Sequence, residues 1–475
     1  MDQSHAPLYE MLTQHVKQQP KSYHVPGHKN GAVFPTEGDV FSHILRYDLT
    51  ELPGLDDLHQ PEGAILEAER LAAAFYKTDY TFFLVNGSTV GNLAMILSVC
   101  QPGDTIIVQR NSHKSIMNGL ELAGAKPIFV SPSYDERTER YSDLKPSNVK
   151  KAIEANPEAK AVMLTHPDYF GTTYDLSRIV EMAHQHNIPV LVDEAHGAHF
   201  PLSNQFPDST LKAGADLVVH SAHKTLPAMT MGSYLHIQGS LVTYETLKHY
   251  LQMLQSSSPS YPIMASLDLA RKYIAGLNEQ DIESTLSGVR QLRHQLNTLP
   301  DIDVMPIQEQ VDDPLKITLT SRRLYMRAVE QLMQDQQVFP EMIQNNQLLL
   351  IYGLQAEQSP LNWVTTLKDS LTHLYNQSKH DTIAINKFQF NDVQGLAYDY
   401  HILKGMPTQW VRWQDAEGQI AASSVIPYPP GIPILLKGER IQAEQIRYIE
   451  QAIQNHQYIQ YNGKDIEQGI EIFIE

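Results

Sequence analysis

Seven short apolar runs of strand type, separated by segments with helical spacing, constrain the fold of this 475-residue chain more than any other feature. The runs are "YTFFLVNG", "TIIVQR", "KPIFVSP", "AVMLTHP", "IPVLVDEA", "ADLVVHSA" and "GSYLHI". Helix-like segments lie between them, at residues 90–99, 113–123, 146–155 and 176–186. Strands that are apolar throughout and alternate with helices are typical of a parallel sheet buried on both faces. We therefore expect an α/β fold with a mostly parallel, seven-stranded sheet sandwiched by helices.

The length and the change of pattern along the chain predict several domains. Residues 1–50 are expected to form an N-terminal helix and arm, residues 51–285 the large sheet-bearing domain, and residues 286–475 a smaller α+β C-terminal domain. The last domain should contain a strand, a helix and a second strand, namely "PLKITLT", "SRRLYMRAVEQLMQDQ" and "NQLLLIYGL". Its segment "VIPYPPGIPILLKGE" contains too much proline for the interior of a sheet.

Composition and charge exclude several classes of protein. The formal net charge of −18 argues against a general nucleic-acid binder, which needs a basic face. The one cysteine, Cys100, excludes a disulfide framework within the chain, and no Cys/His spacing indicates a metal site. The N-terminus lacks the apolar core of a signal peptide, and no run is long enough to span a bilayer. A cytoplasmic enzyme that acts on a small molecule, with no nucleic-acid or membrane partner, is the simplest expectation.

Polar side chains follow five of the predicted strands at the point where each strand ends. The clusters are Asn86–Thr89, Asn111–His113, His166–Tyr169, Asp193–His196 and Ser221–Lys224. In open parallel sheets, ligands bind beyond the carboxyl ends of the strands. The sequence therefore predicts a binding site built from these clusters.

Two of the clusters have a specific chemistry. The stretch "VNGSTVGN" joins a strand to a helix, so that backbone N–H groups and the hydroxyls of Ser88 and Thr89 would form a phosphate site. Taken alone, a simple helix cap explains this stretch equally well or better. Asp193 ends an apolar run, and a carboxylate at the buried end of a strand needs a cationic partner. A protonated pyridine nitrogen or an Arg or Lys side chain would serve.

Lys224 and His113 complete a recognisable set. A lysine at a strand end, flanked by Ser221 and His223, can form a Schiff base with an aldehyde when its surroundings lower its pKa. A histidine in the place of His113 can stack on a flat heteroaromatic ring. Singly, a surface lysine and a capping histidine are the simpler interpretations. Together with the phosphate site and Asp193, they match what pyridoxal 5'-phosphate (PLP) requires of a protein.

Longer segments of the chain resemble a known family. They are "YHVPGHKNG", "VNGSTVGNLAMI", "RNSHKSIMNGLELAGA", "VDEAHGAHF", "HSAHKTLPAMTMGSYLH", "LQSSSPSYPIMASLDLAR" and "YPPGIP". With these segments the chain resembles the prokaryotic ornithine/lysine/arginine decarboxylases, which are PLP enzymes of fold type I, the aspartate-aminotransferase fold. The resemblance extends from Tyr23 to Pro433 and is to the short form, without an N-terminal wing domain.

The resemblance implies a role for each matching position. Lys224 would carry the Schiff base, Asp193 would keep the pyridine nitrogen protonated, and His113 would stack on the ring. Lys224 or His223 would protonate the α carbon after carbon dioxide leaves. The expected cofactor-binding set is Ser88, Thr89, His113, Asp193, Ala195, His196, Ser221, His223 and Lys224.

The resemblance also implies a homodimer with shared active sites and an acidic receptor for the substrate's distal cation. Ser258, Ser260 and Tyr261 are candidates to reach the neighbouring subunit. Glu51 and Asp56, in "DLTELPGLDDL", are candidates to bind the substrate, although a solvated acidic loop with a helix cap explains this stretch equally well.

Three positions depart from the family pattern: Ala222, Met231 and Asp168 stand where Thr, Gln and Thr are common. None removes a central role, but each could change the choice among arginine, lysine and ornithine. Two alternatives stay open. The chain could be an aminotransferase or lyase that clamps a carboxylate with Arg412 or Arg440, or a PLP-binding regulator without turnover.

Overall fold

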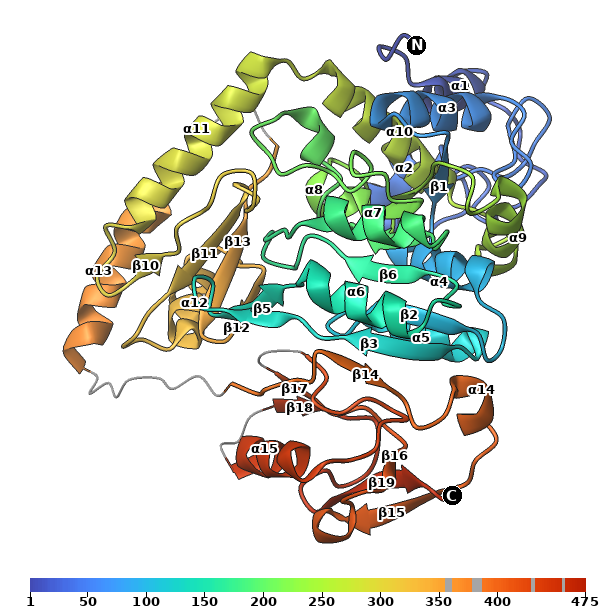
Figure 1. Cartoon of the computed structure of the whole chain (residues 1–475). Coiled ribbons are helices and arrows are strands. Elements are labelled where there is room, and N and C mark those ends of the chain that lie inside the picture. The colour runs from blue at the N-terminus through green and yellow to red at the C-terminus, as the bar shows by residue number, and fades with distance from the viewer. Residues whose placement is uncertain (355–360, 378–386, 429–431, 455–457) are drawn as a thin grey trace. The chain divides into compact units, whose positions relative to one another are not determined.

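The structure is a computed structural model that describes residues 1–354, 361–377, 387–428, 432–454 and 458–475 (Figure 1). The described chain forms two compact units, each assembled from several segments. The first unit comprises Met1–Val99, Lys114–Gly119 and Val180–Asn278. The second comprises Cys100–His113, Leu120–Ile179 and Glu279–Glu475.

The first unit holds four strands of the large sheet, in the order β1-β9-β8-β7. Strands β7 and β8 are parallel, whereas β9 runs antiparallel to both β8 and β1. The elements are α1 (Pro7–Lys17), η1 (Thr36–Phe41), α2 (Ser42–Leu45), α3 (Ala64–Tyr76), β1 (Tyr80–Leu84), α4 (Gly87–Val99), β7 (Val190–Asp193), η2 (Phe200–Leu202), β8 (Leu217–His220), α8 (Ala222–Thr225), β9 (Ser233–Ile237), α9 (Tyr244–Leu254) and α10 (Tyr261–Gly276).

Local sequence explains how these elements start and stop. Every residue of β7, β8 and β9 is buried, as expected for strands covered on both faces. Pro7 occupies the first turn of α1, where its missing N–H costs no hydrogen bond. Helix α3 ends at Lys77, which adopts the left-handed conformation with φ of 59°. Side-chain caps start α9 and α10, at Thr243 and Ser260.

The second unit holds the other four strands of the large sheet, in the order β6-β2-β3-β14, and several smaller sheets. Its elements up to residue 344 are β2 (Thr105–Gln109), α5 (Lys114–Ala123, which begins in the first unit), β3 (Lys126–Val130), β4 (Ser133–Asp135), β5 (Arg140–Asp143), α6 (Pro146–Ala155), β6 (Val162–Thr165), α7 (Leu176–Gln185, which ends in the first unit), α11 (Glu279–Leu296), β10 (Asp303–Val304), β11 (Lys316–Thr320), α12 (Met326–Gln334) and β12 (Met342–Gln344).

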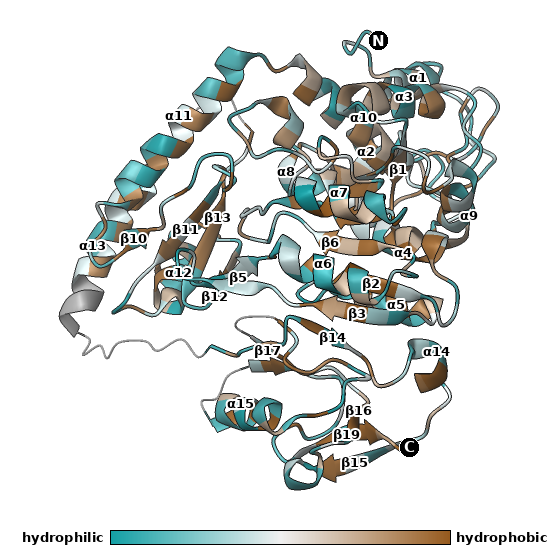
Figure 2. Ribbon diagram, in the orientation of Figure 1, coloured by the Kyte–Doolittle hydropathy of each residue, from teal (hydrophilic) through white to brown (hydrophobic). Residues whose placement is uncertain are grey.

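The remaining elements of this unit follow residue 344. They are β13 (Gln347–Ile351), α13 (Asn362–Gln377), β14 (Val393–Gly395), α14 (Tyr400–Leu403), β15 (Thr408–Arg412), η3 (Trp413–Asp415), β16 (Ile420–Ala421), β17 (Ile426–Tyr428), α15 (Ala443–Gln454), β18 (Tyr458–Gln460) and β19 (Gly469–Phe473). Figure 2 shows β11 and β13 as mostly hydrophobic, whereas the long helix α11 alternates between hydrophobic and hydrophilic residues along its length. That alternation is typical of a helix that packs on one face only.

The predicted α/β class is confirmed, with two differences in detail. All seven predicted strands are present, and β14 adds an eighth, antiparallel to β3. It has three residues, "VQG", and no apolar run, so no pattern announced it. The predicted helix within residues 1–20 is the shorter α1.

The predicted domain boundaries at residues 50 and 285 stay a prediction; α11 runs across the second of them. Among its described residues, the proline-rich segment contributes the strand β17, which pairs with β18 in a two-stranded ladder. Residues 429–431 of the resembling segment "YPPGIP" lie outside the described residues.

Candidate active site

Asp193 is the last residue of β7 and only 4% exposed. Its Oδ2 accepts a hydrogen bond from Asn92 Nδ2 at 2.9 Å, and its Oδ1 accepts one from the Ala195 backbone N–H at 3.2 Å. Both donors are neutral. A buried carboxylate with neutral donors only keeps an unbalanced negative charge. Asp193 is therefore suited to hold a cation supplied from outside the described chain.

Lys224 lies on α8, the single helical turn that follows β8. Its Nζ lies 3.1 Å from His196 Nε2, and His196 is buried. His196 follows β7 by three residues, in the same strand-end loop as Asp193. The fold of the first unit thus brings an amine and an imidazole together from the ends of two adjacent parallel strands.

Three hydroxyls gather where α4 begins. Ser88 Oγ lies 2.7 Å from Ser221 Oγ and 3.2 Å from Ser233 Oγ, and all three side chains are buried. Gly87, the first residue of α4, has a φ of +73°, which a side-chain-bearing residue rarely adopts. A helix N-terminus with hydroxyls beside it is an arrangement suited to phosphate. Thr89, also predicted for this site, is exposed on the first turn.

His223 is oriented by the backbone of the following strand. Its Nδ1 lies 3.0 Å from the Gly232 carbonyl oxygen, which can only accept, so Nδ1 carries the proton. The other ring nitrogen, Nε2, is then left to accept or donate elsewhere. Met231 precedes that glycine with a φ of 75°, and its carbonyl accepts from the Gly87 N–H at 2.9 Å. Ala222, where the family often has a hydroxyl, is fully buried.

His113 and Asp168 belong to the second unit. His113 is exposed and immediately precedes α5. Asp168 Oδ1 accepts from the Thr172 N–H at 2.8 Å, and Oδ2 lies 3.8 Å from Arg140 Nε. Burial raises the pKa of Asp168, and the positive charge of Arg140 opposes that shift. Asp168 thus organises its own turn.

The structure gives two predicted residues different partners. The carboxylate of Asp56 accepts from backbone N–H groups at the start of α3 and just before it: those of Asp57, Glu62, Gly63, Ile65 and Leu66. Asp56 therefore works as a helix cap, and its role in substrate binding stays a prediction. Glu51 is exposed and accepts from the Thr50 hydroxyl at 2.6 Å.

Tyr261 is fully buried within its own unit and donates its hydroxyl to the Asp56 carbonyl. The hydroxyl is thus bound within its own chain, and the expectation that Tyr261 reaches a neighbour stays a prediction. Ser260 caps α10, where its hydroxyl accepts from the Ile263 N–H, and Ser258 is exposed. Of the three residues proposed to reach a neighbour, Ser258 is the one left on the surface.

Sequence reasoning missed three polar residues of this region: Asn92, Ser115 and Ser233. Asn92 donates to both Asp193 and Ser115 Oγ, the second at 2.9 Å. It stands four residues after Ser88, so both lie on one face of α4. That spacing is a signal that could have revealed Asn92. Ser115 and Ser233 gave no such signal, because only the tertiary fold brings them here.

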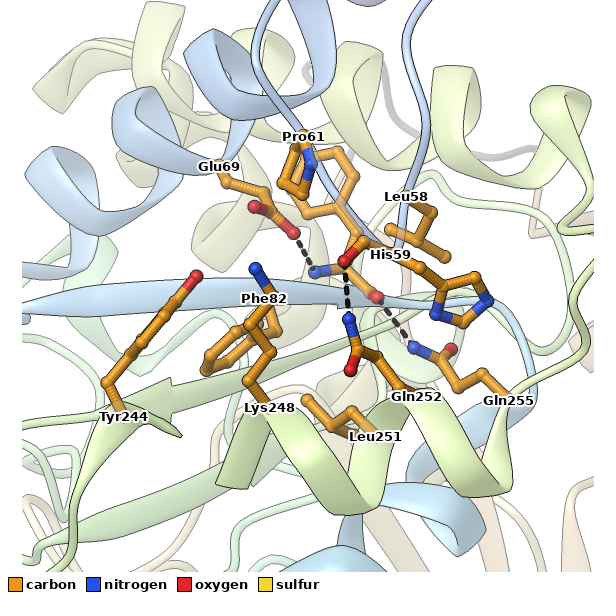
Figure 3. Close-up of a pocket in the computed structure, with 11 residues that line it drawn as sticks. Leu58, His59, Pro61, Glu69, Phe82, Tyr244, Lys248, Leu251, Gln252 and Gln255 are labelled. Atoms are coloured by element: carbon orange, nitrogen blue, oxygen red, sulfur yellow. Dashed lines mark hydrogen bonds between the residues drawn. The ribbon is translucent and has the colours of Figure 1, made fainter. Parts of the chain in front are cut away.

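A separate small pocket lies in the first unit, between α3, β1 and α9 (Figure 3). It holds about 20 Å³ of water-accessible space, roughly the room of one water molecule. Its lining is Leu58, His59, Pro61, Glu69, Phe82, Phe83, Tyr244, Lys248, Leu251, Gln252 and Gln255. Burial raises the pKa of Glu69 to about 8, although the Phe83 N–H donates to it. No residue predicted to bind the cofactor lines this pocket.

Solved structures establish the class of fold. Lysine decarboxylase A from Pseudomonas aeruginosa superposes with a TM-score of 0.81 at 21% identity, over 98% of this chain and 80% of that chain. A structure of SPT with PLP superposes with a TM-score of 0.52 at 18% identity, over 65% of this chain and 76% of that chain. At these identities the likeness defines the fold: the chain has the fold-type-I α/β architecture.

Sequence comparison then defines the family. The model described as Orn/Lys/Arg decarboxylase, major domain, matches residues 6–321, and that described as Orn/Lys/Arg decarboxylase, C-terminal domain, matches residues 396–460. The chain belongs to the Orn/Lys/Arg decarboxylase family. Uncharacterized protein YaaO of Bacillus subtilis (strain 168) is 42% identical over 99% of this chain and 98% of its own length. Arginine decarboxylase of Bacillus anthracis is 34% identical over 96% of this chain and 94% of its own length.

Proposed function

We propose that this protein is a PLP-dependent carboxy-lyase that decarboxylates a basic amino acid: arginine, lysine or ornithine. Family membership supports the reaction and the substrate class. The observation that carries the cofactor assignment is Asp193, a buried carboxylate whose described donors are neutral. A protonated pyridine nitrogen is a cation that would balance the charge of the Asp193 carboxylate.

The residues of the first unit fit PLP in two further respects. The hydroxyls of Ser88 and Ser221 and the N-terminus of α4 would hold the phosphate. Lys224, beside His196, would supply the amine that binds the aldehyde. His113 would stack on the ring, as the family resemblance implies. When bound, PLP supplies the electron sink for the pair released as the Cα–carboxylate bond breaks.

The chain's own residues supply orientation and proton control. Asp193 would hold a proton on the ring nitrogen, and Asn92 and the Ala195 N–H keep that carboxylate in place. Lys224 and His223 are the groups that would deliver a proton to Cα after carbon dioxide leaves. The Gly232 carbonyl holds the Nδ1 proton of His223, so the proton that His223 would deliver to Cα is a second one, carried on Nε2 of the imidazolium. We assign the substrate's distal cation to Glu51, the exposed carboxylate of the acidic loop.

A transaminase needs an arginine that clamps the substrate carboxylate, and neither candidate fits that role well. Arg440 is exposed and pairs with Glu475, with Nη2 and Oε1 3.0 Å apart. Arg412 is exposed at the end of β15. A regulator without turnover would not need to keep Lys224 beside His196. Decarboxylation therefore remains the function that we propose.

Three further statements belong to the proposal. We expect a homodimer with shared active sites, in which Ser258 is the exposed candidate to contact the neighbour. We expect the product amine to enter polyamine biosynthesis. We place the enzyme in the cytoplasm; no helix of the described residues is long and apolar enough to cross a membrane.

The test is mass spectrometry of the purified protein incubated with PLP and an equimolar mixture of arginine, lysine, ornithine and other amino acids. One basic amino acid should yield an amine lighter by carbon dioxide. Lys224→Ala should abolish this product, whereas Lys212→Ala should not, because Lys212 is an exposed partner of Asp208. Keto-acid products, or full activity of the Lys224→Ala variant, would contradict the proposal.

A further inference from the structure

A chain of buried polar side chains crosses the sheet of the first unit, with one residue directly after β7 and one residue in each of β8, β9 and β1. Glu194 Oε2 lies 2.7 Å from His220 Nε2, and His220 Nδ1 lies 3.0 Å from His236 Nε2. His236 Nδ1 lies 2.8 Å from Thr81 Oγ1. Glu194, His220 and His236 are fully buried, and Thr81 is nearly so. The four residues follow the strand order β7, β8, β9 and β1.

The hydrogen bonds of this chain run in one direction. Glu194 also accepts from Ser209 Oγ at 2.7 Å and from the Thr210 N–H at 2.8 Å, as an ionised carboxylate does. With both imidazoles neutral, His220 donates from Nε2 to Glu194 and accepts at Nδ1 from His236 Nε2. His236 in turn accepts from the Thr81 hydroxyl. Burial holds the pKa of His236 well below its usual range, so this imidazole is neutral.

The same chain is joined to the strand ends that carry the proposed active site. Glu194 directly follows Asp193, and their side chains point to opposite faces. His220 directly precedes Ser221. The Tyr76 ring packs against the imidazoles of His220 and His236, with centroids 5.1 Å and 4.5 Å apart. Its hydroxyl donates to the Ala198 carbonyl at 3.0 Å, in the loop that also carries His196.

We propose that Glu194 is a positioning residue, which acts through the ordered chain Glu194–His220–His236–Thr81. This chain fixes the end of β7, with Asp193 and His196, relative to the end of β8, with Ser221 and Lys224. The inference rests on the proposed function, since those residues are assigned there to the cofactor.

The test is Glu194→Gln, which keeps the size of the side chain but removes its charge and places an amide N–H₂ beside His220 or its other donors. We expect this substitution to change which ring nitrogen carries the proton in the imidazoles of the chain. In the cofactor-free protein, ¹⁵N NMR at neutral pH should show both His220 and His236 protonated on Nε2, and Glu194→Gln should move at least His220 to Nδ1. In the PLP-loaded enzyme, we expect kcat to fall at least about tenfold with KM changed less than about threefold.

Asp216→Asn is the matched control, because Asp216 forms a similar pair at the opposite end of the same two strands. Its Oδ2 accepts from His184 Nε2 and from the Val190 N–H, both at 2.8 Å, and it is also buried. We expect Asp216→Asn to lower thermal stability but to leave kcat and the tautomers of His220 and His236 unchanged. Equal losses of kcat in both variants at equal losses of stability would overturn the proposal.

Thr81→Val is the second variant, in case Glu194→Gln does not fold. It removes the donor at the far end of the chain, and we expect a changed His236 Nδ1 resonance and a severalfold lower kcat. An unchanged resonance or an unchanged kcat would overturn the proposal. Absence of decarboxylase activity in the wild type would count against the proposed function only. The NMR readout and the affinity for PLP, which we expect Glu194→Gln to weaken at least about threefold, would then still decide the positioning role.

Discussion

At the scale of single residues, the adjacent carboxylates Asp193 and Glu194 are assigned different roles because different hydrogen-bond donors surround them. Asp193 and Glu194 are adjacent and both buried, yet only Glu194 has a histidine among its partners. Asp193 has the amide of Asn92 and a backbone N–H. Sequence analysis could predict the role of Asp193 from its place at a strand end. It could not assign Glu194, because Ser209, His220 and the other partners come together only in the folded sheet.

Replacing Asp193 by Asn tests its assignment to a cation. The amide keeps the shape and can still bond with Asn92, but it has no charge to stabilise a protonated ring nitrogen. We expect kcat to fall by at least about a hundredfold, the usual loss when one preorganised electrostatic partner is removed. Steady-state kinetics measures this fall, with Asp208→Asn, an exposed carboxylate, as the control. Near-normal kcat in Asp193→Asn would refute the assignment.

Glu69 predicts a pH dependence of stability. Its folded pKa of about 8 lies above the ordinary value of 4.5 for a glutamate, so the folded protein binds this proton more tightly than the unfolded chain. The stabilising contribution is complete below about pH 4.5 and is lost as the pH rises through about 8. The upper limit of this loss is on the order of 5 kcal/mol.

Glu69→Gln resembles the protonated side chain and should remove this part of the pH dependence. We expect the free energy of unfolding, measured by urea denaturation, to fall less between pH 6 and pH 9 in the variant than in the wild type. Identical pH profiles for the two proteins would show that Glu69 is already ionised in the folded state at pH 6.

At the scale of elements, strand patterns were the most informative part of the sequence. All seven apolar runs became strands, because complete burial demands apolar residues at every position. The short strand β14 has no such pattern and was missed. Helix α3 shows a second limit of sequence-based prediction. Its cap, Asp56, lies outside the helix, eight residues before the first helical residue Ala64, so no local capping motif indicates it.

The capping role of Asp56 gives a prediction about stability. Asp56→Ala would leave several N–H groups at the start of α3 without an acceptor. We expect the free energy of unfolding to fall by about 2 kcal/mol, toward the upper end of measured cap losses. Chemical denaturation measures this, and Glu51→Ala, on the exposed part of the same loop, should change it little. An unchanged stability in Asp56→Ala would mean that solvent replaces the cap without cost.

At the scale of the whole molecule, residues far apart in the sequence complete one another's hydrogen bonds. In the second unit, Arg110 follows β2 and forms a buried bidentate ion pair with Glu439, with Nη2 and Oε2 2.9 Å apart. Its remaining N–H groups donate to the carbonyls of Pro433 and Ile434. No sequence pattern links residues so distant, whereas the polar clusters at the strand ends could be predicted to converge because the topology of a parallel sheet brings strand ends together. Family resemblance then supplied roles that spacing alone had left open.

We expect that breaking the Arg110–Glu439 ion pair strongly destabilises the folded protein. Glu439→Gln leaves a buried guanidinium without its counter-charge, and we expect a loss of about 3–5 kcal/mol in the free energy of unfolding. The exposed pair Arg440–Glu475 is the matched control: Glu475→Gln should have no measurable effect. Equal, small effects of both substitutions in urea denaturation would contradict this account.

We propose that Lys224 binds PLP in a site where the carboxylate of Asp193 pairs with the protonated pyridine nitrogen. The most direct measurement is borohydride reduction of the PLP-loaded protein, followed by peptide mass mapping. We predict one phosphopyridoxyl group per chain, on Lys224, and none in the Lys224→Ala variant. A modification on another lysine, or equal labelling of wild type and Lys224→Ala, would contradict it.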